Sequence, residues 1–198
     1  MKLSVTGDIH GDVFLLFGMT ESMSDEEMLF VAGDFGMFWY DTKICQEKML
    51  IINDILENKN SYIVFVDGNH DNHRFLNSQE VSDFYGAKSH KLMTRIIHIM
   101  RGEILRIDDI KIFCFGGAYS VDRFWRVKNE TYFEEELPNQ EEYDNGIMNL
   151  KRNNMKVDYI LTHTCPRSLV EKLGARHNVA EEEKLQNFIQ WVIDNVEY

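Results

Sequence analysis

The feature that most constrains this chain is a series of short apolar runs, each ending in a loop of Gly, Asp, Asn or His. Potential metal ligands follow four of these runs, at residues 8–10, 34, 69–70 and 163. Short apolar runs predict strands, and the longer segments between them carry the period of amphipathic helices. Ligands gather outside the carboxyl ends of strands in α/β sheets, so we expect the four loops to converge on one site.

The order of the predicted elements indicates a layered α/β fold. Strands are predicted at residues 3–6, 28–32, 62–66, 95–100, 103–107, 110–115 and 157–161. Helices are predicted from about residue 12, over 41–58, over 139–154 and over 180–196. Strand–helix units thus come first, a meander follows, and a further unit ends the chain. This order favours a mixed α/β sandwich over a simple doubly wound sheet.

Composition narrows the class of protein. A chain of 198 residues predicts a single domain over 1–198, and its net charge of −12 disfavours nucleic-acid and anionic membrane partners. The N-terminus lacks a secretory signal, and the apolar runs are too short to span a bilayer. The three cysteines, Cys45, Cys114 and Cys165, are odd in number and not spaced as CxxC. They predict buried thiols in a cytoplasmic protein.

The residue types at the strand ends favour a metal centre. Carboxylates come from Asp8 and Asp34, imidazoles from His10 and His163, and an amide from Asn69. This set suits Mn²⁺, Fe or Zn²⁺, and it lacks the thiolates of a structural zinc site. Each residue alone has an ordinary explanation, such as a turn or a core histidine. Their joint occurrence at successive strand ends is the stronger signal.

Four short motifs resemble a known family. Residues 7–11 (Gly-Asp-Ile-His-Gly), 33–34 (Gly-Asp), 68–71 (Gly-Asn-His-Asp) and 162–163 (Thr-His) resemble the first four motifs of the calcineurin-like metallophosphoesterases. The resemblance covers residues 3–166. It implies two mixed β-sheets packed as a four-layer sandwich between helices, with a two-metal centre at the strand ends.

The resemblance also implies roles for the ligands. Asp8 and His10 would hold one metal, Asn69 and His163 the other, and Asp34 would bridge them. Two divalent ions would then be the cofactors, with Mn²⁺ favoured and Fe, Zn²⁺ and Ni²⁺ left open.

Further roles concern proton transfer and phosphate binding. The resemblance makes His70 the candidate general acid, and its ordinary pKa suits that role. Asp71 either orients a loop or a histidine or caps the helix that starts near Asn72. Arg123 and Arg126 are candidates for binding a phosphate, and the alternative is a surface ion pair with neighbouring Glu residues.

The remaining aromatic and histidine residues are assigned more weakly. Tyr119, Phe124 and Trp125 form either an aromatic wall for an aryl group or simple packing. The histidines outside the motifs are interpreted as structural: His73, His90, His98 and His177.

The chain departs from the family pattern in two places. Met37 and Phe38 stand where many members have Asp and Arg, which disfavours a dedicated Ser/Thr protein phosphatase. The fifth motif, Gly-His-x-His, is absent from the sequence. Our hypothesis is a truncation just before that strand, and the alternative is a natural member without it. Each metal would keep three protein ligands, so we expect impaired activity.

The leading interpretation is a metal-dependent phosphoesterase that hydrolyses phosphomonoesters or phosphodiesters through a metal-activated water. Its substrate would be a small phosphate ester or a phosphoprotein. A non-catalytic scaffold on the same fold is the alternative, although the clustered carboxylates and imidazoles favour an enzyme. A nuclease is a third reading, which the acidic charge disfavours.

Overall fold

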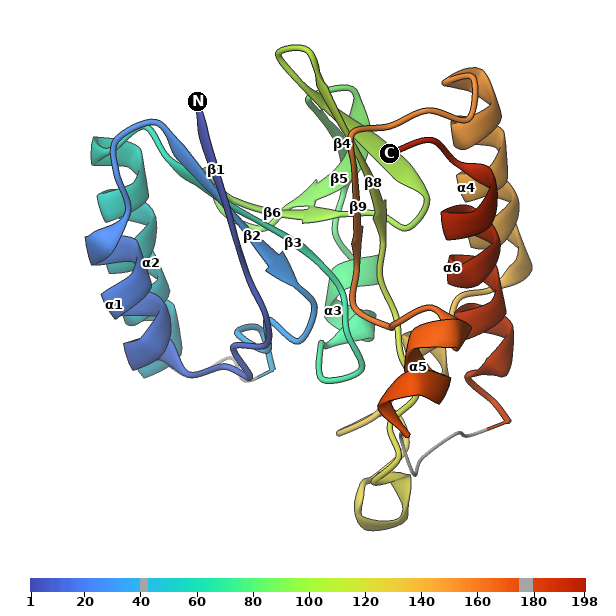
Figure 1. The fold of residues 1–198 in the computed structure, drawn as a ribbon. Helices are drawn as coiled ribbons and strands as arrows, with labels where there is room; N and C mark the ends of the chain where they lie inside the picture. The colour runs from blue at the N-terminus through green and yellow to red at the C-terminus, as the bar shows by residue number, and fades with distance from the viewer. Residues whose placement is uncertain (40–42, 175–179) are drawn as a thin grey trace.

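Two β-sheets form the centre of the molecule in the computed structural model, which describes residues 1–39, 43–174 and 180–198 (Figure 1). The larger sheet has six strands in the order β1-β2-β3-β6-β5-β4. Its strands are β1 (Lys2–Thr6), β2 (Glu27–Ala32), β3 (Tyr62–Val66), β4 (Val81–Phe84), β5 (Ala87–Lys91) and β6 (Ile96–Ile99). β1, β2, β3 and β6 are parallel, whereas β5 and β4 complete the sheet in antiparallel pairs.

The smaller sheet packs against the larger one. It contains β7 (Glu103–Ile107), β8 (Ile110–Phe115) and β9 (Tyr159–Thr162), with β7 antiparallel and β9 parallel to β8. One apolar cluster fills the space between the sheets, and it includes Phe30 and Val64 from the first sheet and Leu105 and Cys114 from the second.

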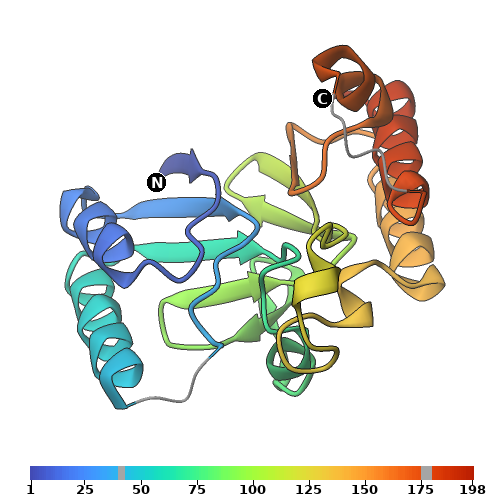
Figure 2. The ribbon, with the colours of Figure 1, turned by 90° about the horizontal axis from the view of Figure 1, so that it is seen from below.

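Helices cover the outer faces of both sheets (Figures 1 and 2). α1 (Val13–Ser22) and α2 (Lys43–Asn58) lie beside the larger sheet, and α4 (Gln140–Arg152) and α6 (Glu183–Asn195) lie beside the smaller one. The short helices are α3 (His73–Asn77) and α5 (Arg167–Leu173), and two 3₁₀ turns occupy Arg123–Trp125 and Glu134–Glu136. The predicted four-layer sandwich is therefore confirmed.

Local sequence explains these elements. β3 is a near-continuous apolar run because both of its faces are buried. Asp12 caps α1 by accepting from the amides of Phe14 and Leu15, and Asn139 forms a capping box with Glu142 at the start of α4. On α2, the predicted apolar stripe is buried at Met49, Ile52 and Leu56, whereas the side chain of Cys45 lies outside the described residues.

Some elements differ from the prediction. The antiparallel pair β4–β5 was not predicted, because its half-exposed strands contain Ser, Asp, Lys and His rather than an apolar run. α5 was also missed. The last predicted strand begins at Tyr159 instead of residue 157, and the last helix begins at Glu183 instead of 180.

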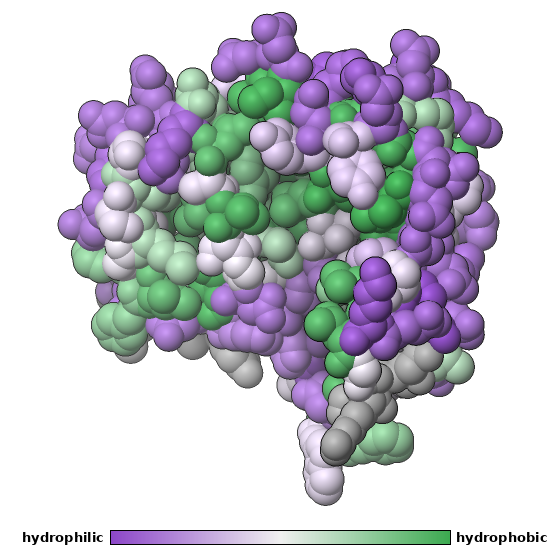
Figure 3. All heavy atoms as spheres, in the orientation of Figure 1, coloured by the Kyte–Doolittle hydropathy of each residue, from purple (hydrophilic) through white to green (hydrophobic). Residues whose placement is uncertain are grey.

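An apolar groove of about 280 Å³ lies between the edge strands β1 and β9. Leu3, Val5, Phe30, Ile112 and Tyr159 contribute to its walls. Figure 3 shows hydrophobic atoms gathered in the hollowed middle of this face. Among the described residues, no helix is long and apolar enough to cross a membrane.

Candidate metal centre

The predicted ligands lie together where four strands end. Asp8 and His10 follow β1, Asp34 follows β2, and Asn69 follows β3. His163 follows β9 and so comes from the other sheet. The cluster therefore spans both sheets, as the strand-end pattern predicts.

Two sets of ligand atoms face the two oxygens of the Asp34 carboxylate. His10 Nε2 lies 3.6 Å from Asp34 Oδ2 and 3.5 Å from Asp8 Oδ2. On the other side, His163 Nε2 lies 3.6 Å from Asp34 Oδ1 and 3.4 Å from Asn69 Oδ1. Metal–ligand bonds of about 2.0–2.2 Å place the ligand atoms of one ion at about these separations. The donor set therefore fits two divalent ions with Asp34 between them.

Hydrogen bonds orient the ligands of the second set. His163 Nδ1 lies 2.7 Å from the carbonyl oxygen of Ala32, so Nδ1 carries the proton and Nε2 keeps its lone pair for a metal. Asn69 donates from Nδ2 to Ser120 Oγ at 3.2 Å, which leaves Oδ1 facing His163. Sequence reasoning missed Ser120, which belongs to the loop after β8.

The backbone at the centre is tightly constrained. His10 and Asp34 adopt left-handed conformations, with φ of 51° and 50°, a region that Asp and His enter more readily than most residues other than glycine. Gly33 and Gly68 make room for the side chains, since a Cβ would lie 2.2 Å from His163 Nδ1 at Gly33 and 2.1 Å from Asp34 Oδ1 at Gly68. The two glycines thus allow the ligands to approach one another.

The comparison with known families agrees with this geometry. A family model of the calcineurin-like phosphoesterases matches residues 1–192. The chain belongs to the calcineurin-like phosphoesterase family. A search of curated proteins returned no match. Membership supports a metal-binding hydrolase at the level of the family.

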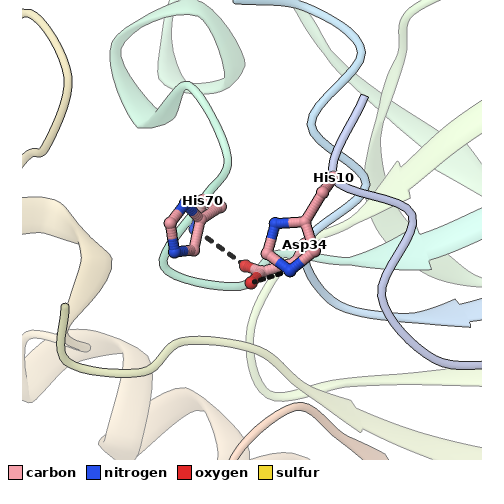
Figure 4. Close-up of side chains that lie close together, drawn as sticks. All are labelled: His10, Asp34 and His70. Atoms are coloured by element: carbon pink, nitrogen blue, oxygen red, sulfur yellow. Dashed lines mark hydrogen bonds and ion pairs between the residues drawn. The ribbon is translucent and has the colours of Figure 1, made fainter. Parts of the chain in front are cut away.

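In this member of the family, His70 lies beside His10 and Asp34 (Figure 4). Its backbone amide donates to Asp34 Oδ1 at 2.7 Å, and its ring centre is 4.8 Å from that of His10. Burial lowers the pKa of His70; the Asp34 charge opposes this shift, and Arg126 and His10 add to it. A guanidinium can only donate, so the contact between Arg126 Nη2 and His70 Nδ1 at 3.3 Å leaves the proton of a neutral His70 on Nε2.

Asp71 holds two of the ligand loops in place. It is buried, and its carboxylate accepts from the amides of Gly36 and Gly68, each at 2.8 Å. Burial raises the pKa of Asp71 to about 7, although these two hydrogen bonds oppose the rise. The cap of α3 is Asn72, which accepts from the amide of Phe75. The structure therefore places Asp71 in the loop-orienting role and not in the capping role.

The two candidate phosphate-binding arginines have different surroundings. Arg126 lies at the site, where it contacts His70 and donates to Ser120 Oγ at 2.7 Å, and its Nη1 lies 3.6 Å from the partly exposed carboxylate of Asp122. Arg123 donates to the fully buried Glu136 and covers the ring of Tyr119 at 4.0 Å. The charge of Arg123 is thus paired with Glu136, which is the ion-pair alternative, and we do not assign phosphate binding to it.

The other predicted side chains lie away from the ligand cluster. Phe124 and Trp125 are 95% and 91% exposed, so they neither pack nor form a wall at the site. His73, His90 and His98 are buried, and the last two form a hydrogen-bonded pair beside Asp67. His177 lies outside the described residues.

One further residue was missed. Trp39 donates from Nε1 to the carbonyl oxygen of His70, and its ring stacks on Phe133 at 5.7 Å. Neither contact has a sequence signal, since the partners lie far from Trp39 in the chain.

Met37, at the first of the two departures from the family pattern, is buried in the apolar cluster under α1 and α2, and Phe38 packs against that cluster.

Proposed function

We propose that this chain is a two-metal phosphoesterase that hydrolyses small phosphomonoesters or phosphodiesters in the cytoplasm. The observation that carries the proposal is the position of Asp34. Its Oδ2 faces His10 and its Oδ1 faces His163, while Asp8 lies within reach of both histidines and Asn69 Oδ1 faces His163. Such a carboxylate can hold two cations together against their mutual repulsion.

The residues of the chain have distinct roles in this proposal. Divalent ions at the centre, with Mn²⁺ favoured, would provide a water of lowered pKa and offset the charge on the phosphoryl oxygens. The Nε2–H of neutral His70 donates a hydrogen bond to the leaving oxygen and stabilises the charge that develops there. Arg126 binds a phosphoryl oxygen while Ser120 orients its guanidinium. Asp71 keeps the loops that carry Asp34 and His70 in register.

The test is hydrolysis of p-nitrophenyl phosphate and bis-p-nitrophenyl phosphate with added Mn²⁺, Fe²⁺, Zn²⁺ or Ni²⁺. We expect metal-dependent turnover, and we expect Asp34→Asn to lower it by about 100-fold or more because the bridging charge is lost. Asp25→Asn is the matched control, since Asp25 is an exposed carboxylate away from the centre.

Turnover that persists without metal, or that survives in Asp34→Asn, would contradict the two-metal mechanism. An absence of turnover with all four metals would contradict the assignment as an enzyme. The faster of the two esters would show whether the chain is a monoesterase or a diesterase.

A further inference from the structure

A cavity of about 310 Å³ opens beside His10 and His70. Its walls include Val13, Met37, Trp39 and Met49, with Arg126 and Thr131 at its border. Because His70 donates a hydrogen bond to the leaving oxygen in the proposed function and also lines this cavity, the cavity lies on the side toward which the leaving group departs. It is the space that a leaving group would enter.

The walls of this cavity are apolar and held in place. Trp39 is fixed by its stack on Phe133 and by its hydrogen bond to His70, and Met37 and Met49 are 8% and 4% exposed. The guanidinium of Arg126 lies 5.9 Å from the ring of Trp39. An indole edge with two thioethers nearby favours a flat apolar ring over a polyol.

Among the described residues, the polar side chains at this cavity are His10, His70, Arg126 and Thr131, and the first three have roles at the metals and the phosphoryl group in the proposed function. The hydroxyl of Thr131 already accepts from the amide of Val127 at 2.7 Å and donates to the carbonyl of Val127. Along the wall formed by Val13, Met37, Trp39 and Met49, a sugar or a peptide would gain less than an apolar ring does. The volume also lies at the lower end of the range for small-molecule sites, which suits one or two rings.

We propose that the leaving group of the substrate is an aromatic ring of a small molecule, bound between Trp39 and the two methionines. This inference rests on the proposed function. The water oxygen forms a bond to phosphorus while the bond from phosphorus to the aryl oxygen breaks. The aryl oxygen leaves with a hydrogen bond from His70 Nε2–H and takes up the proton that the attacking water loses, so the products are a phenol-type alcohol and inorganic phosphate from a monoester, or a phosphomonoester from a diester.

The experiment compares phenyl phosphate with methyl phosphate in the wild type, Trp39→Ala, Trp39→Phe and Ile51→Ala. Trp39→Ala should lower the ratio of the two kcat/KM values, phenyl over methyl, about 10-fold, mainly through KM. Comparing one substrate pair across variants cancels the intrinsic reactivity of the esters. Ile51, exposed on α2, is the control that should leave both values unchanged.

Trp39→Phe separates packing from positioning. It keeps an aromatic ring but loses the hydrogen bond to His70, so it should retain most of the preference for phenyl phosphate. If Trp39→Ala lowers kcat/KM equally for both substrates, Trp39 acts through His70 and the leaving-group assignment is overturned. A phosphotyrosine peptide that is turned over more than 10-fold better than phenyl phosphate would overturn the small-molecule assignment.

A binding measurement keeps this inference separate from the proposed function. Phenylphosphonate and methylphosphonate are titrated calorimetrically into the protein with Mn²⁺ present. We expect phenylphosphonate to bind about 10-fold more tightly, and Trp39→Ala to remove the difference. Equal affinities in the wild type would overturn the aromatic site. If phenylphosphonate binds more tightly but no ester is hydrolysed, the aromatic site is supported and only the catalytic proposal is contradicted.

Discussion

The side-chain amide of Asn69 has a nitrogen and an oxygen, and the hydrogen bond made by the nitrogen decides that the oxygen faces the metal centre. Ser120 fixes the amide of Asn69 and itself donates to the fully buried Glu136 at 2.8 Å. Glu136 is held in turn by Arg123. This buried chain of contacts keeps Asn69 Oδ1 turned toward His163, so Ser120 is a positioning residue.

Replacing Ser120 tests that role. Ser120→Ala leaves the Asn69 amide free to rotate, and we expect the affinity for the second Mn²⁺ to fall by about 10-fold, the lower range for residues that orient a metal ligand. Calorimetric titration resolves the two sites. Ser22→Ala is the control, because Ser22 is an exposed serine bonded to the carbonyl of Met19. An unchanged second affinity would contradict the role of Ser120.

The sequence predicts which residues supply the ligands but not how they are held. Asp8, His10, Asp34, Asn69 and His163 are recognisable because each follows an apolar run. Their supporting partners come from loops distant in sequence. For Arg123 the sequence leaves two alternatives, phosphate binding and an ion pair with a glutamate. Only the folded loop shows that Arg123 pairs with a glutamate 13 residues away.

At the scale of elements, one carboxylate joins the first two strands. Glu27 lies at the start of β2 and accepts from Lys2 Nζ at 2.8 Å and from Ser4 Oγ at 2.7 Å, both on β1. The amide of Ser24 donates to it as well. Burial raises the pKa of Glu27, but these hydrogen bonds outweigh it and lower the pKa from 4.5 to about 2.

This lowered pKa predicts an acid-dependent contribution to stability. The contribution of the Glu27 carboxylate is fully present above pH 4.5, the unfolded value, and is lost as the pH falls through about 2, the folded value. We expect Glu27→Gln to lower the free energy of unfolding by about 1–3 kcal/mol at pH 7. Urea unfolding measures the difference. It should vanish near pH 2, and a difference that grows on acidification would contradict the assignment.

Elements with a clear apolar pattern could be predicted, and the others could not. β2 and β3 are buried on both faces and are visible as apolar runs. The β4–β5 pair has no such run, because part of each strand is exposed and pairing across the hairpin decides its structure. Propensity alone is too weak to predict strands of this kind.

At the scale of the whole molecule, the ligand cluster connects the two sheets. Only His163 comes from the smaller sheet, and its Nδ1 is bonded to Ala32 at the end of β2. Metal binding should therefore stabilise the contact between the sheets, because a ligand that binds only the folded state raises its stability.

Thermal unfolding measures this coupling. With Mn²⁺ at about 100 times its Kd, we expect about 2.7 kcal/mol of added stability, which corresponds to roughly 5–10 °C in Tm for a chain of this size. His163→Ala should lose much of this shift. His90→Ala is the control, since His90 is a buried histidine outside the cluster. A full shift in His163→Ala would show that metal does not couple the sheets.

The sandwich itself could be predicted because strand–helix units, a meander and a further unit follow one another in the sequence. The order of strands within each sheet could not. β6 pairs with β3 although the β4–β5 hairpin lies between them in sequence, and β9 pairs with β8 after a long excursion. Such pairings depend on long-range contacts that local patterns do not encode.

The groove between β1 and β9 also bears on how molecules of this protein behave toward one another. Among the described strands, both lie at sheet edges, and unpaired edges beside an apolar surface favour edge-to-edge association. The net charge of −12 opposes such encounters. That repulsion reaches about 10 Å at 0.1 M salt and shortens as salt is added. We therefore expect the colloidal stability of this protein to decrease as ionic strength rises.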